Sequence, residues 1–132
     1  MIAKLYAITL PMFFAVDMVW LGFIAKKFYS QHIGHLMRTS PNWAAAGVFY
    51  LLFIAGLVVF VISPAIDRGQ WQYAVLLGGF FGLVTYATYD LTSQAVIKDW
   101  PLMVTMADMT WGTILAASVS GVVYWVATRF VL

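Results

Sequence analysis

The sequence predicts an all-α integral membrane protein. We expect a bundle of four transmembrane helices in one domain, residues 1–132, with a short interfacial helix between the first and second helices. Of the 132 residues, 64% are hydrophobic and 9% are charged, whereas soluble domains average about 45–50% and about 25%. So apolar a chain cannot cover a soluble globule with polar side chains, and it is too apolar to be disordered. The few charges also divide it into four long apolar stretches.

Each apolar stretch is long enough to cross a bilayer. The stretches cover approximately residues 5–25, 43–66, 73–97 and 102–128. A helix of about 20 residues crosses a hydrocarbon core of about 30 Å, whereas the strands of a barrel are about 10 residues long and alternate in polarity. Turn-forming residues occur at Ser40-Pro41-Asn42, Ser63-Pro64, Asp67-Arg68-Gly69 and Lys98-Asp99-Trp100-Pro101. We expect Ser63-Pro64 to close the second span and the other three to lie in the connections.

The long connection between the first two spans, residues 26–42, carries an amphipathic pattern. Its apolar residues recur at helical spacing, with polar residues opposite them. The apolar set is Tyr29, Ile33, Leu36 and Met37, and the polar set includes Lys27, Gln31, His35 and Arg38. The pattern fits a short helix lying in the membrane interface and also fits a solvated loop.

Four spans place both chain ends on one side of the membrane. The basic residues outside the spans divide almost evenly, with Lys4, Arg68 and Arg129 on that side and Lys26, Lys27, Arg38 and Lys98 on the other. This bias is too small to fix the orientation by the positive-inside rule. The excess of positive charge outside the spans suits anionic lipid headgroups, so membrane lipid is an expected partner and no nucleic acid is required.

Three aspartates lie inside the spans at one depth. Asp17, Asp90 and Asp108 each lie eight or nine residues from the charged residue that ends their span on the side of the long connection. At 1.5 Å per residue, each carboxyl group is about 12–14 Å inside the same membrane edge. Tyr50 has the matching depth in the second span. One polar layer is therefore expected to draw on all four helices.

Small residues predict how the third and fourth spans meet. Residues spaced by four form a row on each span: Gly78, Gly82, Tyr86, Asp90 and Gln94 on one, and Asp108, Gly112, Ala116 and Ser120 on the other. Such rows let membrane helices approach closely, and packing alone is sufficient to explain them. In an antiparallel hairpin they would also bring Asp90 opposite Asp108.

Buried acids at one depth suggest a binding site. Each aspartate near a helix centre costs about 2.5–3.5 kcal/mol, and no Lys, Arg or His lies within a span to offset that cost. Protonation and hydrogen bonding to a neighbour would explain a single acid. For three acids, we treat Asp17, Asp90 and Asp108 as binding residues and candidates for proton transfer, since neighbouring carboxyls can hold and exchange a proton.

Aromatic residues at the same level widen the range of ligands. Trp20, Tyr50, Tyr86, Tyr89 and Trp111 would present ring faces to an organic cation. Carboxylates with tyrosine oxygens would instead suit a hard divalent cation such as Mg²⁺, Ca²⁺ or Mn²⁺. No other cofactor is evident, because the chain lacks cysteine and the spans lack histidine and lysine. Haem, copper, catalytic zinc and a retinal-type Schiff base are therefore excluded.

Several motifs resemble those of the domain of unknown function 2177 family. They are Asp17-Met18-Val19-Trp20-Leu21-Gly22, Phe49-Tyr50, Tyr89-Asp90-Leu91-Thr92, Trp100-Pro101 and Asp108-Met109-Thr110-Trp111-Gly112-Thr113. The resemblance covers nearly the whole chain. It implies a bacterial membrane protein with four spans, for which we expect a multi-pass location in the inner membrane.

Three functions remain open from the sequence. The first is a three-aspartate, aromatic-lined site that binds a cation or exchanges protons in small-molecule transport, with a homodimer because four helices enclose little space. The second is a membrane-embedded enzyme or enzyme subunit acting on a lipid or isoprenoid, although no nucleophile or oxyanion hole is evident. The third is a structural protein whose aspartates pair with basic groups of another subunit.

Overall fold

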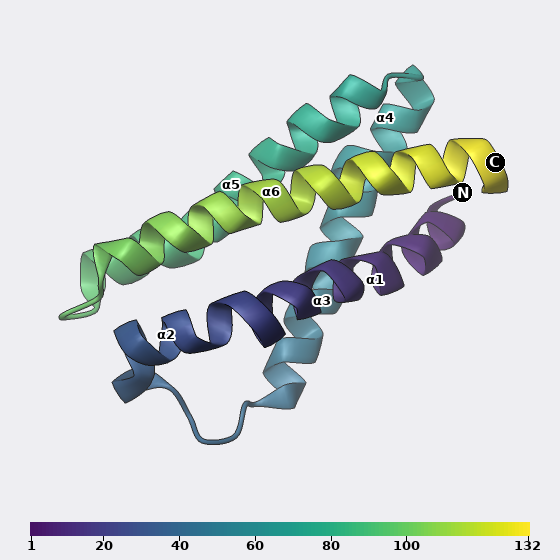
Figure 1. The fold of residues 1–132 in the computed structure, drawn as a ribbon. Coiled ribbons are helices and arrows are strands. Elements are labelled where there is room, and N and C mark those ends of the chain that lie inside the picture. Colours follow the sequence, from purple (N-terminus) through teal and green to yellow (C-terminus); the bar gives the residue numbers. More distant parts are fainter.

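The computed structural model describes residues 1–132, and it is entirely helical. Its elements are α1 (Ile2–Val19), a π-helical turn (Trp20–Ala25), α2 (Lys26–Ile33), a 3-10 turn (Gly34–Leu36), α3 (Trp43–Leu57), a π-helical turn (Val58–Ile62), α4 (Ser63–Arg68), α5 (Trp71–Val96), α6 (Leu102–Val126) and a π-helical turn (Ala127–Val131). They join into four continuous helical segments, each long and apolar enough to cross a membrane. Both chain termini lie at one end (Figure 1). The predicted four-span membrane fold is confirmed.

The first helical segment is longer than the predicted span. The helix continues from α1 through α2 to Leu36, and only residues 37–42 form an irregular connection. The short helix expected after the first span is therefore present, and no non-helical residue separates it from α1. No proline occurs between Pro11 and Pro41, so nothing in this stretch forces the helix to end.

The second segment corrects one expected boundary. We expected Ser63-Pro64 to close the span, but the helix continues through both residues to Arg68. Pro64 stands at the start of α4, directly after a π-helical turn. The change of hydrogen-bond pattern at the π-helical turn accommodates the proline, which lacks an N–H. The segment ends instead at Gly69, whose φ of 65° is a left-handed conformation that glycine adopts without strain.

Helices α5 and α6 run side by side and antiparallel along most of their length (Figure 1). A Cβ atom on Gly82 would overlap the carbonyl oxygen of Gly112, and one on Gly78 would lie 2.6 Å from the Ser120 hydroxyl oxygen. Gly112 in turn leaves the space that the Tyr86 ring fills. The predicted rows of small residues are thus the contact line between the two helices.

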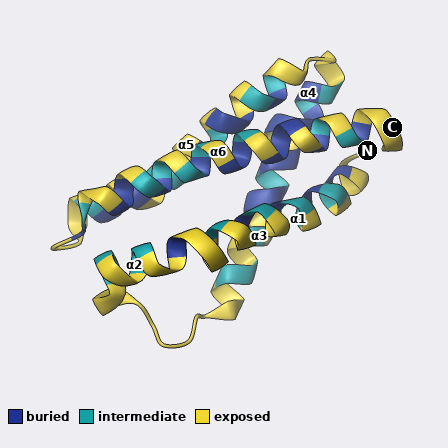
Figure 2. Cartoon of the chain, in the orientation of Figure 1, coloured by how far each residue is buried: buried dark blue, intermediate teal, exposed yellow.

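The core fills the half of the bundle that contains the chain termini. On α1 the buried side chains form a row spaced by four, which runs Leu5, Thr9, Phe13 and ends at Asp17. In the second segment burial starts only at Phe53, and no residue between Trp43 and Leu52 is buried (Figure 2). The first half of α3 therefore diverges from the bundle, which leaves space between α3 and its neighbours on the side of the long connection.

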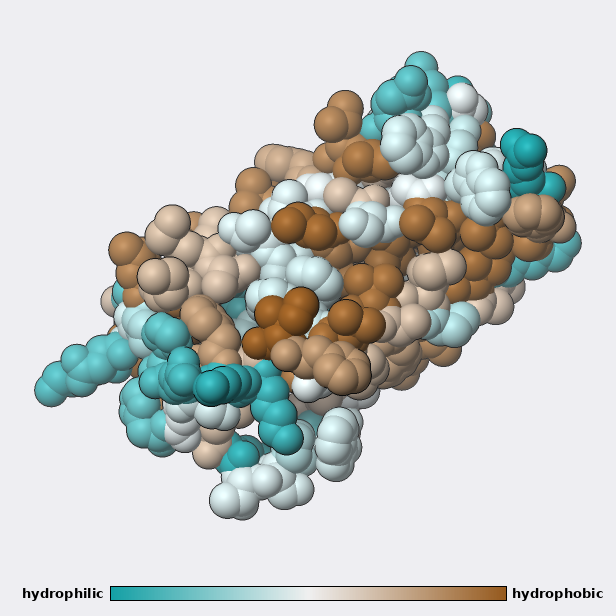
Figure 3. Space-filling model, viewed as in Figure 1, coloured by the Kyte–Doolittle hydropathy of each residue, from teal (hydrophilic) through white to brown (hydrophobic).

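The outer surface of the bundle is apolar between two hydrophilic ends (Figure 3). Many large hydrophobic side chains are exposed on it, such as Phe23 at 86% and Val96 at 80%. In water so much exposed apolar surface would drive association. A hydrocarbon environment removes that penalty, in agreement with four membrane spans.

The glycine contact yields a stability prediction. We expect Gly82→Ala to lower the free energy of unfolding in detergent by about 1–3 kcal/mol, because the added methyl group forces α5 away from α6. Gly47→Ala is the matched control, since a Cβ there meets nothing within 4 Å and alanine favours the helix. Thermal and denaturant unfolding followed by circular dichroism measure both changes. Equal stability of the two variants would contradict the packing role of Gly82.

Candidate functional site

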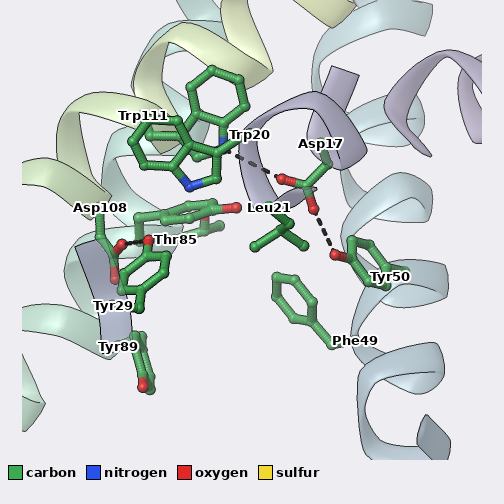
Figure 4. Close-up of a pocket in the computed structure, with 11 residues that line it drawn as sticks. Asp17, Trp20, Leu21, Tyr29, Phe49, Tyr50, Thr85, Tyr89, Asp108 and Trp111 are labelled. Atoms are coloured by element: carbon green, nitrogen blue, oxygen red, sulfur yellow. Dashed lines mark hydrogen bonds between the residues drawn. The ribbon is translucent and has the colours of Figure 1, made fainter. Parts of the chain in front are cut away.

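A pocket of about 390 Å³ lies between the loop-side halves of the four helical segments (Figure 4). Its lining draws on every segment: Asp17, Trp20, Leu21 and Tyr29 from the first, Phe49 and Tyr50 from the second, Thr85, Tyr86 and Tyr89 from the third, and Asp108 and Trp111 from the fourth. The splayed first half of α3 makes room for it. The pocket is thus a product of how the bundle packs.

Asp17 joins three helices at the pocket wall. Its side chain is 4% exposed. One carboxyl oxygen accepts a hydrogen bond from the Tyr50 hydroxyl on α3 at 2.5 Å, and the other accepts from the Trp111 Nε1 on α6 at 3.3 Å (Figure 4). Because both donors are aromatic side chains packed in the bundle, the carboxyl group is held in one orientation.

Asp108 occupies the other side of the pocket. Its carboxyl group accepts a hydrogen bond from the Tyr29 hydroxyl, which reaches α6 from α2 (Figure 4). This contact fixes α2 across the loop side of the pocket. The π-helical turn at Trp20–Ala25 lies between α1 and α2, and such turns often occur at functional sites because they reorient the side chains that follow.

Two indole rings form a further wall. Trp20 and Trp111 stack with ring centroids 4.7 Å apart and planes inclined by 9°. Trp20 comes from the π-helical turn and Trp111 from α6, so the stack closes the space between the first and fourth segments. Its aromatic surface lies beside the carboxyl group of Asp17, to which Trp111 donates.

Asp90 lies behind the pocket. It is fully buried between α5 and α6, and neither carboxyl oxygen accepts a hydrogen bond from an N–H or O–H group of the chain. Its carboxyl group interacts with that of Asp108 on the facing helix, the neighbour that the predicted hairpin requires. The nearby polar groups are engaged elsewhere, since Thr105 accepts from the Trp100 indole at 3.1 Å and donates to the Gln94 amide oxygen at 2.8 Å.

The structure brings together most of the residues singled out from the sequence. Those that line the pocket are Asp17, Trp20, Tyr50, Tyr86, Tyr89, Asp108 and Trp111. Asp90 does not line it, although it adjoins Asp108. No group of three or more His, Cys, Asp or Glu side chains is arranged to hold a metal ion, so a divalent cation would have at most two carboxylates from this layer near one point.

Four lining residues escaped the sequence reasoning: Leu21, Tyr29, Phe49 and Thr85. Tyr29 belongs to the apolar face of the amphipathic connection, and the helical continuation of α1 into α2 is what brings it to Asp108. Phe49 precedes Tyr50 in a motif already noted, but sequence spacing did not show that it faces the same space. Leu21 also belongs to a motif already noted, Asp17–Gly22, whereas Thr85 carried no signal of its own.

The lining has one sign of charge. It contains two carboxyl groups and no lysine, arginine or histidine. The remaining polar atoms belong to tyrosine, tryptophan and threonine. The pocket therefore combines an excess of acid with aromatic surface, at a depth where water is scarce.

A protein-family model described as "Predicted membrane protein (DUF2177)" matches residues 2–125 of the chain. No curated protein and no solved structure matches the chain.

The hydrogen bond between Tyr50 and Asp17 yields a prediction. Tyr50→Phe should lower the free energy of unfolding by about 1–3 kcal/mol, because a buried acceptor loses its donor. In the Asp17→Ala background the same change should cost far less, which a double-mutant cycle measures. Tyr124→Phe is the control, since no hydrogen bond of that hydroxyl to the chain exists. Equal costs of Tyr50→Phe in both backgrounds would exclude the coupling.

Proposed function

This chain belongs to the DUF2177 family of predicted membrane proteins, and we propose that its intramembrane pocket binds an organic cation in exchange for a proton. Such an exchange would serve small-molecule transport. The two carboxyl groups of the pocket, Asp17 and Asp108, provide the countercharge, and the aromatic side chains contact the body of the ligand.

The observation that carries the proposal is the charge of the lining. Two carboxyl groups face the pocket and no basic side chain faces them. An ionised carboxylate in a membrane interior is costly unless a positive group lies near it. Since the chain supplies no such group at the pocket, a positively charged ligand is the partner that completes the electrostatics.

The shape and surface of the pocket favour an organic cation. Stacked indoles and tyrosine rings offer negative ring faces, which attract quaternary ammonium groups by about 0.5–2 kcal/mol each. The volume of about 390 Å³ lies in the range of about 300–1,000 Å³ that is usual for sites of small molecules. A hydrated metal ion would use little of this aromatic surface.

Asp90 and Asp108 supply the proton. Asp108 lines the pocket and also interacts with Asp90, whose carboxyl oxygens accept no hydrogen bond from the chain. A proton shared by the two carboxyls removes their repulsion and gives Asp90 a partner. A cation that arrives beside Asp108 favours its ionised form, so the proton leaves as the cation binds. The total charge of the site is then unchanged.

The packing closes the pocket toward the end of the bundle that contains the chain termini. Between the pocket and the end with the chain termini, the bundle is filled by buried apolar side chains, among them Phe13, Phe53, Ile54 and Leu57. The pocket lies on the loop side of this core. Transport would require a second state in which the core opens, as alternating access demands.

The first prediction from this proposal concerns the binding of a cation. Tetramethylammonium should quench the tryptophan fluorescence of the purified protein, with Trp20 and Trp111 as reporters. Asp17→Asn and Asp108→Asn should each weaken binding at least tenfold, because the cation loses a countercharge. Asp67→Asn is the control, since Asp67 is exposed in α4 at the opposite end. A further control compares choline with its neutral analogue 3,3-dimethylbutanol. Equal binding of the two, or full binding by both aspartate variants, would refute a cation site.

The second prediction concerns the proton. Binding of tetramethylammonium should release a proton and strengthen as pH rises, by up to tenfold per unit, because cation and proton compete. The titratable groups that interact with Asp90 are Asp108 and the hydroxyls of Tyr29, Tyr86 and Tyr89. In Asp90→Asn the release and the pH dependence should be lost. Calorimetry in buffers of different ionisation enthalpy counts the protons, and wild-type binding without release would refute the exchange.

A further inference from the structure

We infer that the ligand of the pocket is a membrane-dissolved amphiphile, whose cationic head lies between Asp17 and Asp108 and whose hydrocarbon tail leaves between α3 and α5 into the lipid. This inference rests on the proposed function, because it names the class of cation. It adds a route of entry that the charge of the pocket does not specify.

The mouth of the pocket is marked by its exposed lining. Leu21, Phe49 and Tyr89 are 38%, 48% and 56% exposed, whereas the other lining residues are buried or half-buried. Phe49 lies on α3 and Tyr89 on α5, and both line the pocket (Figure 4). The opening therefore lies between the second and third segments, with Leu21 of the first segment at its edge.

The geometry of α3 creates this opening. The second segment packs against α5 through the turn Val58–Ile62, and none of its residues from Trp43 to Leu52 is buried. The Phe53 ring closes the gap at the end nearer the chain termini. Its centroid lies 5.4 Å from that of the Phe81 ring and 6.1 Å from that of the Tyr86 ring. From Phe53 toward the long connection, α3 and α5 diverge.

The depth of the mouth places it at acyl chains. Phe49 lies six residues after the start of α3, and Tyr89 lies seven residues before the end of α5, which corresponds to about 9–11 Å along each helix. Neighbouring side chains on α3 are also apolar and exposed, with Val48 at 57% and Leu52 at 67%. A tail that leaves through the mouth would therefore lie along apolar helix surface within the hydrocarbon.

The other sides of the pocket are crossed by side-chain contacts. On the loop side, α2 lies across it with Tyr29 bonded to Asp108. Between the first and fourth segments the indoles of Trp20 and Trp111 are stacked, and between the first and second the Tyr50 hydroxyl is bonded to Asp17. A water-soluble cation would have to displace one of these contacts, whereas an amphiphile already in the bilayer would not.

The test compares alkyltrimethylammonium ions with tails from methyl to dodecyl, bound to the full chain in lipid nanodiscs. In the wild type, affinity corrected for partition into empty nanodiscs should rise at least tenfold along the series. Phe49→Trp narrows the mouth, so it should weaken dodecyl binding at least tenfold more than tetramethylammonium binding. Phe60→Trp is the matched control, because Phe60 is 67% exposed on the same segment but does not line the pocket.

The outcomes separate the inference from the proposed function. Equal affinity along the series, or an equal effect of Phe49→Trp on both ligands, would overturn lateral entry and leave a site for water-soluble cations. Absence of any binding that depends on Asp17 and Asp108 would overturn both. Where Phe49→Trp fails to fold by circular dichroism, Tyr89→Trp narrows the same mouth from α5 and carries the same expectation.

Discussion

The burial of carboxyl groups inside membrane spans is the constraint on which the loop-side half of this structure depends. Within hydrocarbon, each polar group must find its partner in the protein. Asp17 finds donors on two other segments, Tyr50 and Trp111, and Asp108 finds the hydroxyl of Tyr29. These bonds connect the first, second and fourth segments where apolar packing is sparse. The pocket is stable because its own walls satisfy its acids.

The tight contact of α5 with α6 is the counterpart of that open half. Glycines at positions 78, 82 and 112 let the two helices approach until side chains on one meet the backbone of the other. The same approach brings Asp90 to the Asp108 side of α6, where neither of its carboxyl oxygens accepts a hydrogen bond from the chain. Close packing and an unpartnered acid are thus consequences of one helix–helix contact, which explains why the acid pair sits at the end of the glycine row.

Some of this arrangement follows from the sequence and some does not. The spans were predictable because the thickness of the membrane sets the length of a helix, and the α5–α6 contact line because residues spaced by four share a side. Spacing also gave the common depth of the three aspartates. Depth does not give the direction in which a side chain points, so Asp90 could not be separated from Asp17 and Asp108. The π-helical turn at Trp20–Ala25 rotates the side chains of the residues that follow it, so the spacing did not predict that Tyr29 reaches Asp108. The π-helical turn before Pro64 lets the helix continue through a proline that was expected to end it.

The two acids of the pocket differ in how firmly their surroundings hold them. Asp17 has two donors from the packed interior of α3 and α6, and it has no acidic neighbour among its bonded partners. Asp108 has one donor from α2, which carries no buried residue, and a second carboxyl group beside it. Under the proposed function this difference assigns separate tasks. Asp17 would be the fixed countercharge, and Asp108 would be the carboxyl group whose bond to Tyr29 can change. Because Tyr29 holds α2 over the pocket, a change at Asp108 would alter the position of α2. Ligand binding and the position of α2 would then be linked through one side chain.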